Sequence, residues 1–180
     1  MQASIAQSLS QSRLMTGMPV ELMQSLAERF GETRDVPAGE VFKKAGDEAV
    51  AAFLVRSGNV QESENRGLAD GAYAYTVGQG EIVGVPALLN GGEESAEFRA
   101  AEDTTLASLD RPQFVDWLSS HSEYRSALAL NAGLDQQFHL LRKTQLFAEL
   151  NAIDLFVLVR ELTPCFERHD SGDHLFHENE

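Results

Sequence analysis

The chain has 180 residues, with 14 Lys and Arg against 28 Asp and Glu, so its formal net charge is −14. This length predicts one domain of roughly 100–150 residues with an appended segment. Apolar residues make up 43% and charged residues 23%, which is typical of a chain that folds around a core. The acidic balance argues against nucleic-acid binding through this segment and against a polybasic membrane anchor, because both need basic patches.

The number of cysteines and the hydropathy of the sequence indicate the cellular compartment. The single cysteine, Cys165, allows no internal disulfide, which fits a reducing compartment. No apolar run approaches the ~20 residues that span a bilayer. Residues 1–14 lack the charged and apolar regions of a signal peptide. We therefore expect a cytoplasmic protein with no direct membrane insertion.

Two helical segments are expected before the first strand. Residues 2–13 are polar, and Ile5 and Leu9 lie four positions apart, which predicts a marginal helix that needs a surface to pack on. A clearer helix begins at Pro19 and extends to about Phe30, since proline suits a first turn. Its apolar residues recur at helical spacing and are Leu22, Met23, Leu26 and Phe30.

Between Thr33 and Asp110 the pattern changes to short strands separated by turns. The expected strands are 41–42, 51–56, 60–64, 73–77, 97–101 and 106–109. Turns rich in glycine or polar residues fall at 37–40, 46–47, 57–58, 65–71 and 78–81. Strands of this length at this spacing are typical of a sandwich or closed barrel.

Helices return after Asp110. A short one is expected over 112–119, and a long one from Ser122 to about Lys143, with Ser122 as N-cap. Residues of the long helix step by three and four, as in a coiled-coil seam: Tyr124, Ala127, Asn131, Leu134, Phe138 and Leu141. The pattern fits a helix packed on its own domain as well as a homodimer formed through the 122–143 helix.

A second copy of the first motif is expected near the end. A turn at 37–42 follows the first clear helix, and a similar turn at 170–176 follows an apolar helix over 153–162. Two strands cannot close a second barrel. We therefore hypothesise that the chain is part of a longer protein with tandem domains.

The ordered motifs resemble the cyclic-nucleotide-binding domain family, the sensory jelly roll of catabolite activators, protein kinase A regulatory subunits and nucleotide-gated channels. The resemblance covers about residues 18–142 and rests on a run of short segments in the family's order. These are Gly39-Glu40-Val41-Phe42, Gly46-Asp47, Phe53 to Val60, Gly80-Glu81-Ile82-Val83-Gly84, Ala87 to Gly92, Ser95-Ala96, Arg99 to Asp103 and Leu109 to Phe114.

The resemblance implies a jelly-roll β-barrel with flanking helices and divides the chain into four parts. These are an N-terminal helical segment (1–17), the jelly roll (18–121), a connecting or dimerisation helix (122–145) and the beginning of a second such domain (146–180). It also implies where a ligand pocket lies. The corresponding residues are Gly84, Val85, Ala87, Glu94, Ser95 and Ala96.

Two positions of that pocket depart from the family. Val85 stands where the family has the Glu that binds the ribose, and Pro86 after it removes a backbone donor. Glu94 stands where the family has the Arg that binds the phosphate. Like charges about 4 Å apart repel by roughly 1–4 kcal/mol, so loss of cyclic AMP and cyclic GMP binding is expected. Arg99 could replace that Arg only if strand alternation did not point it outward.

Catalytic and metal sites are not expected. Cys165, His169, His174 and His177 could be read as a zinc site, but His174 and His177 would point to opposite faces of a strand. The His-x-His pair of metal-binding cupins is absent. No catalytic residue and no cofactor are therefore assigned, and Trp117 is expected to be a packing residue.

The sequence thus predicts a non-catalytic regulatory or interaction module whose partners are the attached domains of a larger protein. The alternative is a sensor that binds a cyclic nucleotide or another small ligand in the same pocket. It would regulate an attached transporter, kinase, channel or transcription factor. An acidic pocket would favour a neutral or cationic ligand.

Overall fold

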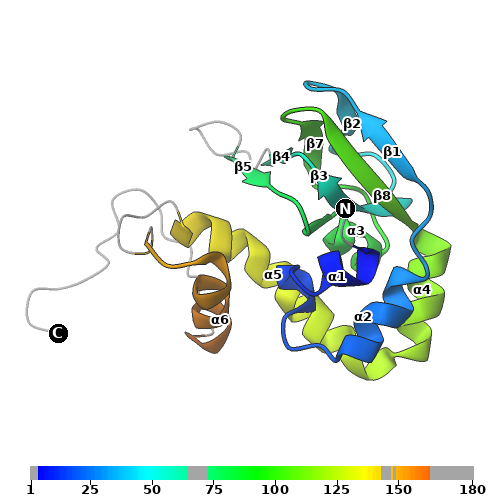
Figure 1. The fold of residues 1–180 in the computed structure, drawn as a ribbon, viewed down its shortest axis with the longest axis vertical. Coiled ribbons are helices and arrows are strands. Elements are labelled where there is room, and N and C mark those ends of the chain that lie inside the picture. The colour runs from blue at the N-terminus through cyan, green and yellow to red at the C-terminus, as the bar shows by residue number, and fades with distance from the viewer. Residues whose placement is uncertain (1–3, 65–72, 143–146, 148, 163–180) are drawn as a thin grey trace, which may run out of the picture.

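The computed structural model describes residues 4–64, 73–142, 147 and 149–162. Eight strands form two antiparallel four-stranded sheets, and the helices gather at one side of them (Figure 1). The expected jelly roll with flanking helices is confirmed. Its strands lie in two separate sheets and not in one closed barrel.

The first sheet has the strand order β1-β8-β3-β6 and the second the order β2-β7-β4-β5. The strands of the first are β1 (Thr33–Val36), β8 (Thr104–Asp110), β3 (Ala51–Ser57) and β6 (Ile82–Val83). Those of the second are β2 (Val41–Lys43), β7 (Ala96–Ala100), β4 (Val60–Glu64) and β5 (Tyr73–Val77).

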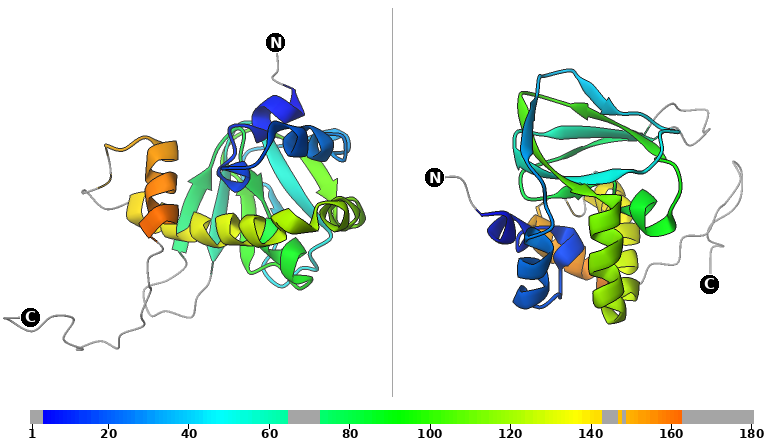
Figure 2. Two further views of the ribbon diagram at one scale, coloured as in Figure 1. Left: turned by 90° about the horizontal axis from the view of Figure 1, so that it is seen from below. Right: turned by 90° about the vertical axis from the view of Figure 1, so that its right-hand side faces the viewer.

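Strand β3 explains how the layers are stacked. All its residues but the last are buried, because it has a covered face on each side. Phe53 and Val55 pack into the core between the two sheets. Ala52 and Leu54 face the opposite way, into a second core shared with the helices. The molecule therefore has three layers, in the order sheet, sheet and helices, as the right-hand view of Figure 2 shows.

The helical layer combines segments from both ends of the chain (Figure 1). Helices α1 (Ile5–Leu9) and α2 (Val20–Ala27), joined by a 3-10 turn η1 (Arg13–Met15), pack beside α4 (Arg111–Ser120). Trp117 of α4 is fully buried and its Nε1 donates to Ser25 Oγ of α2 at 2.9 Å. Trp117 is thus a packing residue, as expected.

The predicted long helix is divided in two. Ser122–Tyr124 form a 3-10 turn, η2, and the helix α5 runs over Arg125–Arg142. The prediction that Ser122 is the N-cap is wrong. Helix α4 ends at Ser120, and its C-cap His121, with φ −133° and ψ 43°, leaves the helical conformation and leads directly into the tighter turn.

The seam of α5 packs within the chain itself. Leu134 and Phe138 form a buried cluster with three residues of α6 (Ala152–Leu162), which are Leu155, Phe156 and Val159. Asn131 is 1% exposed and donates its amide to the backbone oxygens of Leu14 and Thr16 at 2.8 and 3.1 Å. Asn131, Leu134 and Phe138 are therefore accounted for by packing within the chain, the first of the two interpretations of this helix. Dimerisation through 122–143 stays a prediction, as do the four domain boundaries.

The second-copy motif at 170–176 and the cluster Cys165, His169, His174 and His177 lie outside the described residues, as does the expected turn at 65–71. The second copy stays a prediction; of its expected elements only the helix over 153–162 lies among the described residues, as α6. None of the helices in the described ranges combines the length and the hydropathy needed to cross a membrane.

Two glycines provide a matched test of the turns. Gly39 and Gly58 both have positive φ, 83° and 78°. A Cβ at Gly39 would meet nothing within 4 Å, whereas one at Gly58 would lie 2.6 Å from the Asp103 carbonyl oxygen and 2.9 Å from Thr104 Cα. Gly39→Ala should lower the free energy of unfolding by about 1–2 kcal/mol, which is the cost of the left-handed backbone alone. Gly58→Ala should lower it clearly more, because the added Cβ also meets backbone atoms. Urea denaturation measures both, and equal losses would contradict the close packing at Gly58.

Candidate functional site

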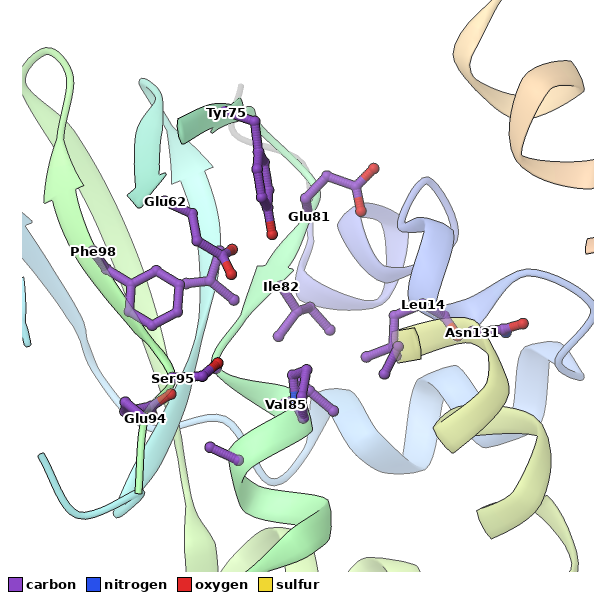
Figure 3. A pocket seen from close by; sticks show the side chains of 15 residues that line it. Leu14, Glu62, Tyr75, Glu81, Ile82, Val85, Glu94, Ser95, Phe98 and Asn131 are labelled. Carbon is purple, nitrogen blue, oxygen red and sulfur yellow. Dashed lines mark hydrogen bonds between the residues drawn. The ribbon is translucent and has the colours of Figure 1, made fainter. Parts of the chain in front are cut away.

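A cavity opens at the edge of the two sheets, where β4, β5 and β7 of the second sheet face β6 of the first and the N-terminal end of the helix α3 (Val85–Asn90). Its volume is about 40 Å³, which is room for about three water molecules at ~10–15 Å³ each. We call it the α3 pocket. Its walls come from η1, β4, β5, β6, α3, β7 and α5 and include Leu14, Glu62, Tyr75, Glu81, Ile82, Val85, Glu94, Ser95, Phe98 and Asn131 (Figure 3).

Helix α3 is defined by glycine and proline. Gly84 precedes it with φ +85° and Gly91 follows it with φ +68°, left-handed conformations that glycine adopts without strain. Pro86 occupies the first turn, where helix N–H groups have no partner within the helix. Because proline has no N–H, this turn offers one donor fewer to an anion than a turn without proline would.

Glu94 is engaged by a cation that lies far away in sequence. Its Oε1 accepts from Lys43 Nζ of β2 at 2.7 Å, and the side chains of Glu94 and Lys43 are only 2% and 6% exposed. Lys43 Nζ lies 3.4 Å from the backbone oxygen of Glu48 as well. A buried ion pair of this kind resists separation, since removing one partner typically costs about 3–5 kcal/mol.

Backbone pairing places the two side chains together. The segment 92–94 runs antiparallel to the turn that follows β2. Gly46 N donates to the backbone oxygen of Glu94, and Glu94 N donates to the backbone oxygen of Asp47, both at 2.8 Å. The Glu94 carboxylate packs directly against Gly84: a Cβ added there would lie 3.4 Å from Glu94 Oε1, an ordinary van der Waals contact.

Burial dominates the ionisation of Glu94. Desolvation raises the pKa of this carboxyl above its ordinary value of 4.5, although the hydrogen bond and the charge of Lys43 act to lower it. The charge of Asp47 adds to the increase. Glu94 is therefore easier to protonate in the folded chain than in the unfolded one.

Three residues in one row across the second sheet form the opposite wall. Glu62 of β4 is paired with Tyr75 of β5 on one side and with Phe98 of β7 on the other. Figure 3 shows the three side chains directed toward the cavity. The wall thus combines two aromatic rings with a carboxylate.

Glu81 closes the pocket toward the N-terminal segment. Its carboxylate accepts from Arg13 Nη1 at 2.6 Å, from Arg13 N at 3.0 Å and from Ser12 Oγ at 3.2 Å. The Arg13 guanidinium lies over the ring of Phe138 at 4.3 Å from its centre. Residues 12–16 are also held by Asn131 of α5 and by Arg160 of α6, which donates to the Thr16 oxygen at 3.2 Å. We call residues 12–16 the N-terminal hub.

The structure brings together most of the residues expected in the pocket. Gly84, Val85, Ala87, Glu94 and Ser95 line it. Ala96 does not; it is buried in the core between the sheets. Arg99 points outward as predicted, with its side chain 43% exposed and hydrogen bonds to Gly39 O and Glu97. Arg99 is therefore not directed into the α3 pocket.

Sequence reasoning missed Lys43, Glu62 and Tyr75. The last two alternate with outward residues on strands that were predicted, so their direction could have been inferred. Lys43 follows an expected strand, but nothing local links it to Glu94, 51 positions later.

The chemistry of the pocket is acidic. Its lining includes the carboxyl groups of Glu62, Glu81 and Glu94, and among the described lining residues there is no Lys or Arg. Across the described ranges, no three His, Cys, Asp or Glu side chains are grouped so as to hold a metal ion. Such a cavity can accommodate neutral or cationic groups more readily than a phosphate.

Comparison with known proteins agrees with the fold. Residues 33–121 match the sequence model of the family described as cyclic nucleotide-binding domain. No curated protein sequence matches the chain. The chain is similar to the crystal structure of the Thermus thermophilus catabolite activator protein. The two share 29% identity and a TM-score of 0.56, over 77% of this chain and 62% of that one.

Two further structures share the fold at lower identity. One is the regulatory domain of Toxoplasma gondii PKA with cAMP, at 17% identity and a TM-score of 0.59, over 87% of this chain and 56% of that one. The other is the N-terminal domain of a transcriptional regulator from Streptomyces coelicolor A3(2). It shares 22% identity and a TM-score of 0.55, over 77% of this chain and 94% of that one. The chain thus spans less than two thirds of the length of the first two proteins.

The ionisation of Glu94 predicts a pH dependence of stability. A carboxyl whose pKa is raised on folding contributes most below its unfolded pKa, and the contribution is lost as the pH rises through the folded pKa. We expect the free energy of unfolding of the wild type to fall relative to Glu94→Gln as the pH increases above 4.5. Urea denaturation of both proteins from about pH 4 to about pH 8 measures this difference.

The matched control is Glu97→Gln, which removes a carboxylate from the exposed pair with Arg99. Exposed ion pairs contribute little to stability. The difference in free energy of unfolding between Glu97→Gln and the wild type should therefore change much less with pH. If the stability of the wild type instead rises relative to Glu94→Gln with pH, the attraction of Lys43 outweighs burial and our account of the pair is wrong.

Proposed function

Residues 33–121 belong to the cyclic nucleotide-binding domain family, and from this membership we propose that the chain is a non-catalytic regulatory and interaction module of a larger protein. We further propose that its α3 pocket does not bind cyclic AMP or cyclic GMP. The module would act by docking to attached domains or to partner proteins.

The observation that carries this proposal is the buried ion pair of Glu94 with Lys43. By resemblance, Glu94 takes the position of the family's phosphate-binding Arg. A phosphate that entered would meet a carboxylate there, and the Lys43 ammonium beside it is already neutralised by that carboxylate. Releasing Lys43 to the phosphate would leave Glu94 buried without its partner, which is costly.

Three other features support the loss of nucleotide binding. Val85 cannot accept a hydrogen bond from a ribose hydroxyl, and Pro86 removes a donor from the first turn of α3. Glu62 and Glu81 add two further carboxyl groups to the lining, neither of which can donate a hydrogen bond to a phosphate when ionised. The volume of about 40 Å³ is well below the ~300 Å³ at which ligand pockets begin.

A second candidate function is favoured by the row of Glu62, Tyr75 and Phe98. Two aromatic rings that flank a carboxylate suit a small neutral or cationic ligand. The chain would then be a sensor of altered specificity, regulating an attached effector. Mass spectrometry of the purified protein under native and denaturing conditions distinguishes the two functions, because a sensor would carry or acquire such a ligand.

Calorimetric titration tests the first function directly. We expect the wild-type chain to release no binding heat with cyclic AMP or cyclic GMP at millimolar concentration. Binding at micromolar strength corresponds to about 8 kcal/mol and would be incompatible with Glu94 facing a phosphate. Arg99→Gln would then show whether that residue supplies the missing cation.

A gain-of-function variant provides the positive control. Glu94→Arg alone would place two cations side by side, so it should be combined with Lys43→Met and Val85→Glu. We expect this triple variant to bind cyclic AMP measurably if its circular dichroism spectrum is that of the wild type. Lys43→Met with Val85→Glu, which retains Glu94, is the matched variant that should not bind.

A further inference from the structure

A second hollow lies at the opposite end of α3 from the pocket. It is formed where the last turn of α3 meets α4 and the beginning of α5, elements that lie side by side in both views of Figure 2. Its volume is about 290 Å³, several times that of the α3 pocket. We call it the arginine groove. Its lining residues are Leu88, Leu89, Asn90, Gly91, Arg111, Phe114, Val115, Leu118, Ser119 and Arg125.

The charge of the arginine groove is opposite to that of the chain. Arg111 and Arg125 line it, and no Asp or Glu does among the described lining residues, although the whole chain carries −14. Both guanidinium groups lie against the end of α3. Arg125 Nη2 donates to the Leu89 oxygen at 3.2 Å, and Arg111 Nη2 lies 2.9 Å from where a Cβ of Gly91 would be.

Most of the bonding capacity of the two arginines is available to a ligand. A guanidinium carries five N–H donors, and the bond to Leu89 uses one of those of Arg125. Arg111 has a carboxylate at 4.0 Å, that of Glu48, which is itself 77% exposed. Such an exposed pair contributes about 0–1 kcal/mol and is readily exchanged for a bidentate carboxylate partner.

The groove also offers a small apolar surface. Val115 is 46% exposed although it is apolar, and Leu89 is half-buried, whereas Leu88, Phe114 and Leu118 lie beneath them and are buried. A small inorganic anion would use the arginines and leave this surface in water. A peptide segment that carries an apolar side chain between acidic ones would use both. A long nucleic-acid chain would be repelled by the net charge of −14.

We propose that the arginine groove is a docking site for an acidic segment of a partner protein. Carboxylates of the segment pair with Arg111 and Arg125, and an apolar side chain between them packs on Val115 and Leu89. The groove is independent of the α3 pocket, so the proposal holds whether or not the pocket binds a ligand. It specifies the surface through which an interaction module of this kind engages its partner.

Selection from a displayed library of random peptides tests the proposal even while the natural partner is unidentified. The immobilised full chain should enrich peptides that contain at least two acidic residues and an apolar residue between them. The most enriched peptide is then synthesised with a fluorescent label and titrated by polarisation. Its affinity should fall at least tenfold between about 50 and about 300 mM salt, because exposed charges are screened.

Variants decide where the peptide binds. Arg111→Gln and Arg125→Gln should each weaken it about fivefold and the double variant at least twentyfold, whereas Arg99→Gln, on another face, should leave the affinity unchanged. Because Arg125→Gln also removes the bond to Leu89, Arg111→Glu serves as a second variant, and unfolding midpoints are compared for all. Binding must be lost in Arg111→Glu while its midpoint matches that of the wild type.

Several outcomes would overturn the proposal. These are the absence of any enriched peptide, enrichment of basic or uncharged peptides, and binding that survives in the double variant. Displacement of the peptide by inorganic phosphate alone at low millimolar concentration would show an anion site in place of a peptide site. Self-association of the wild type in sedimentation experiments that is lost in Arg111→Glu would identify a second copy of the chain as the occupant.

Discussion

The ion pair of Lys43 and Glu94 is the interaction on which the architecture around the pocket depends. It joins the end of β2 to the segment that precedes β7, so it fixes how the second sheet meets helix α3. Backbone hydrogen bonds between that segment and residues 46–49 hold the same region, but they do not select a side chain. The pair does select one, because a buried carboxylate needs a buried cation. Gly84, which immediately precedes α3, lies directly beside the Glu94 carboxylate. The acidic pocket and the rigid turn after β2 thus have one physical origin.

The two ends of α3 differ in charge, and this difference organises the surface of the domain. Its N-terminal end faces three carboxylates in the α3 pocket, and its C-terminal end faces two guanidinium groups in the arginine groove. The second arrangement agrees with the helix dipole, because cations stabilise the C-terminal end of a helix. The first agrees with it too, because negative groups stabilise the N-terminal end, and the carboxylates of Glu81 and Glu94 are each paired with a cation as well. A short helix therefore separates a neutralised acidic cavity from a basic surface groove.

Much of the fold was predictable from the sequence, and the candidate site was predictable in part. Glycine turns and alternating residues define strands locally, so β3, β4 and β5 were predicted nearly to their ends. That Val85 and Glu94 belong to the pocket followed from their place in the ordered set of family motifs. The partner of Glu94 did not, because Lys43 lies 51 positions earlier and only the sheet register brings the two together. Likewise, the start of α5 depended on how the backbone leaves His121, which a favourable N-cap residue at Ser122 does not determine.

The N-terminal hub has a consequence for where the folding unit ends. Residues 12–16 lie outside the family match at 33–121, yet they contact Glu81 within it and Asn131, Phe138 and Arg160 beyond it. A polypeptide trimmed to the matched residues would therefore keep the sheets but leave the carboxylate of Glu81 without Arg13. It would also expose the apolar surface that Leu9, Leu14 and Met15 now cover. The unit that folds is larger than the unit that homology delimits. Excising, fusing or transplanting this domain should respect the cooperative unit, which begins near α1 and includes α5.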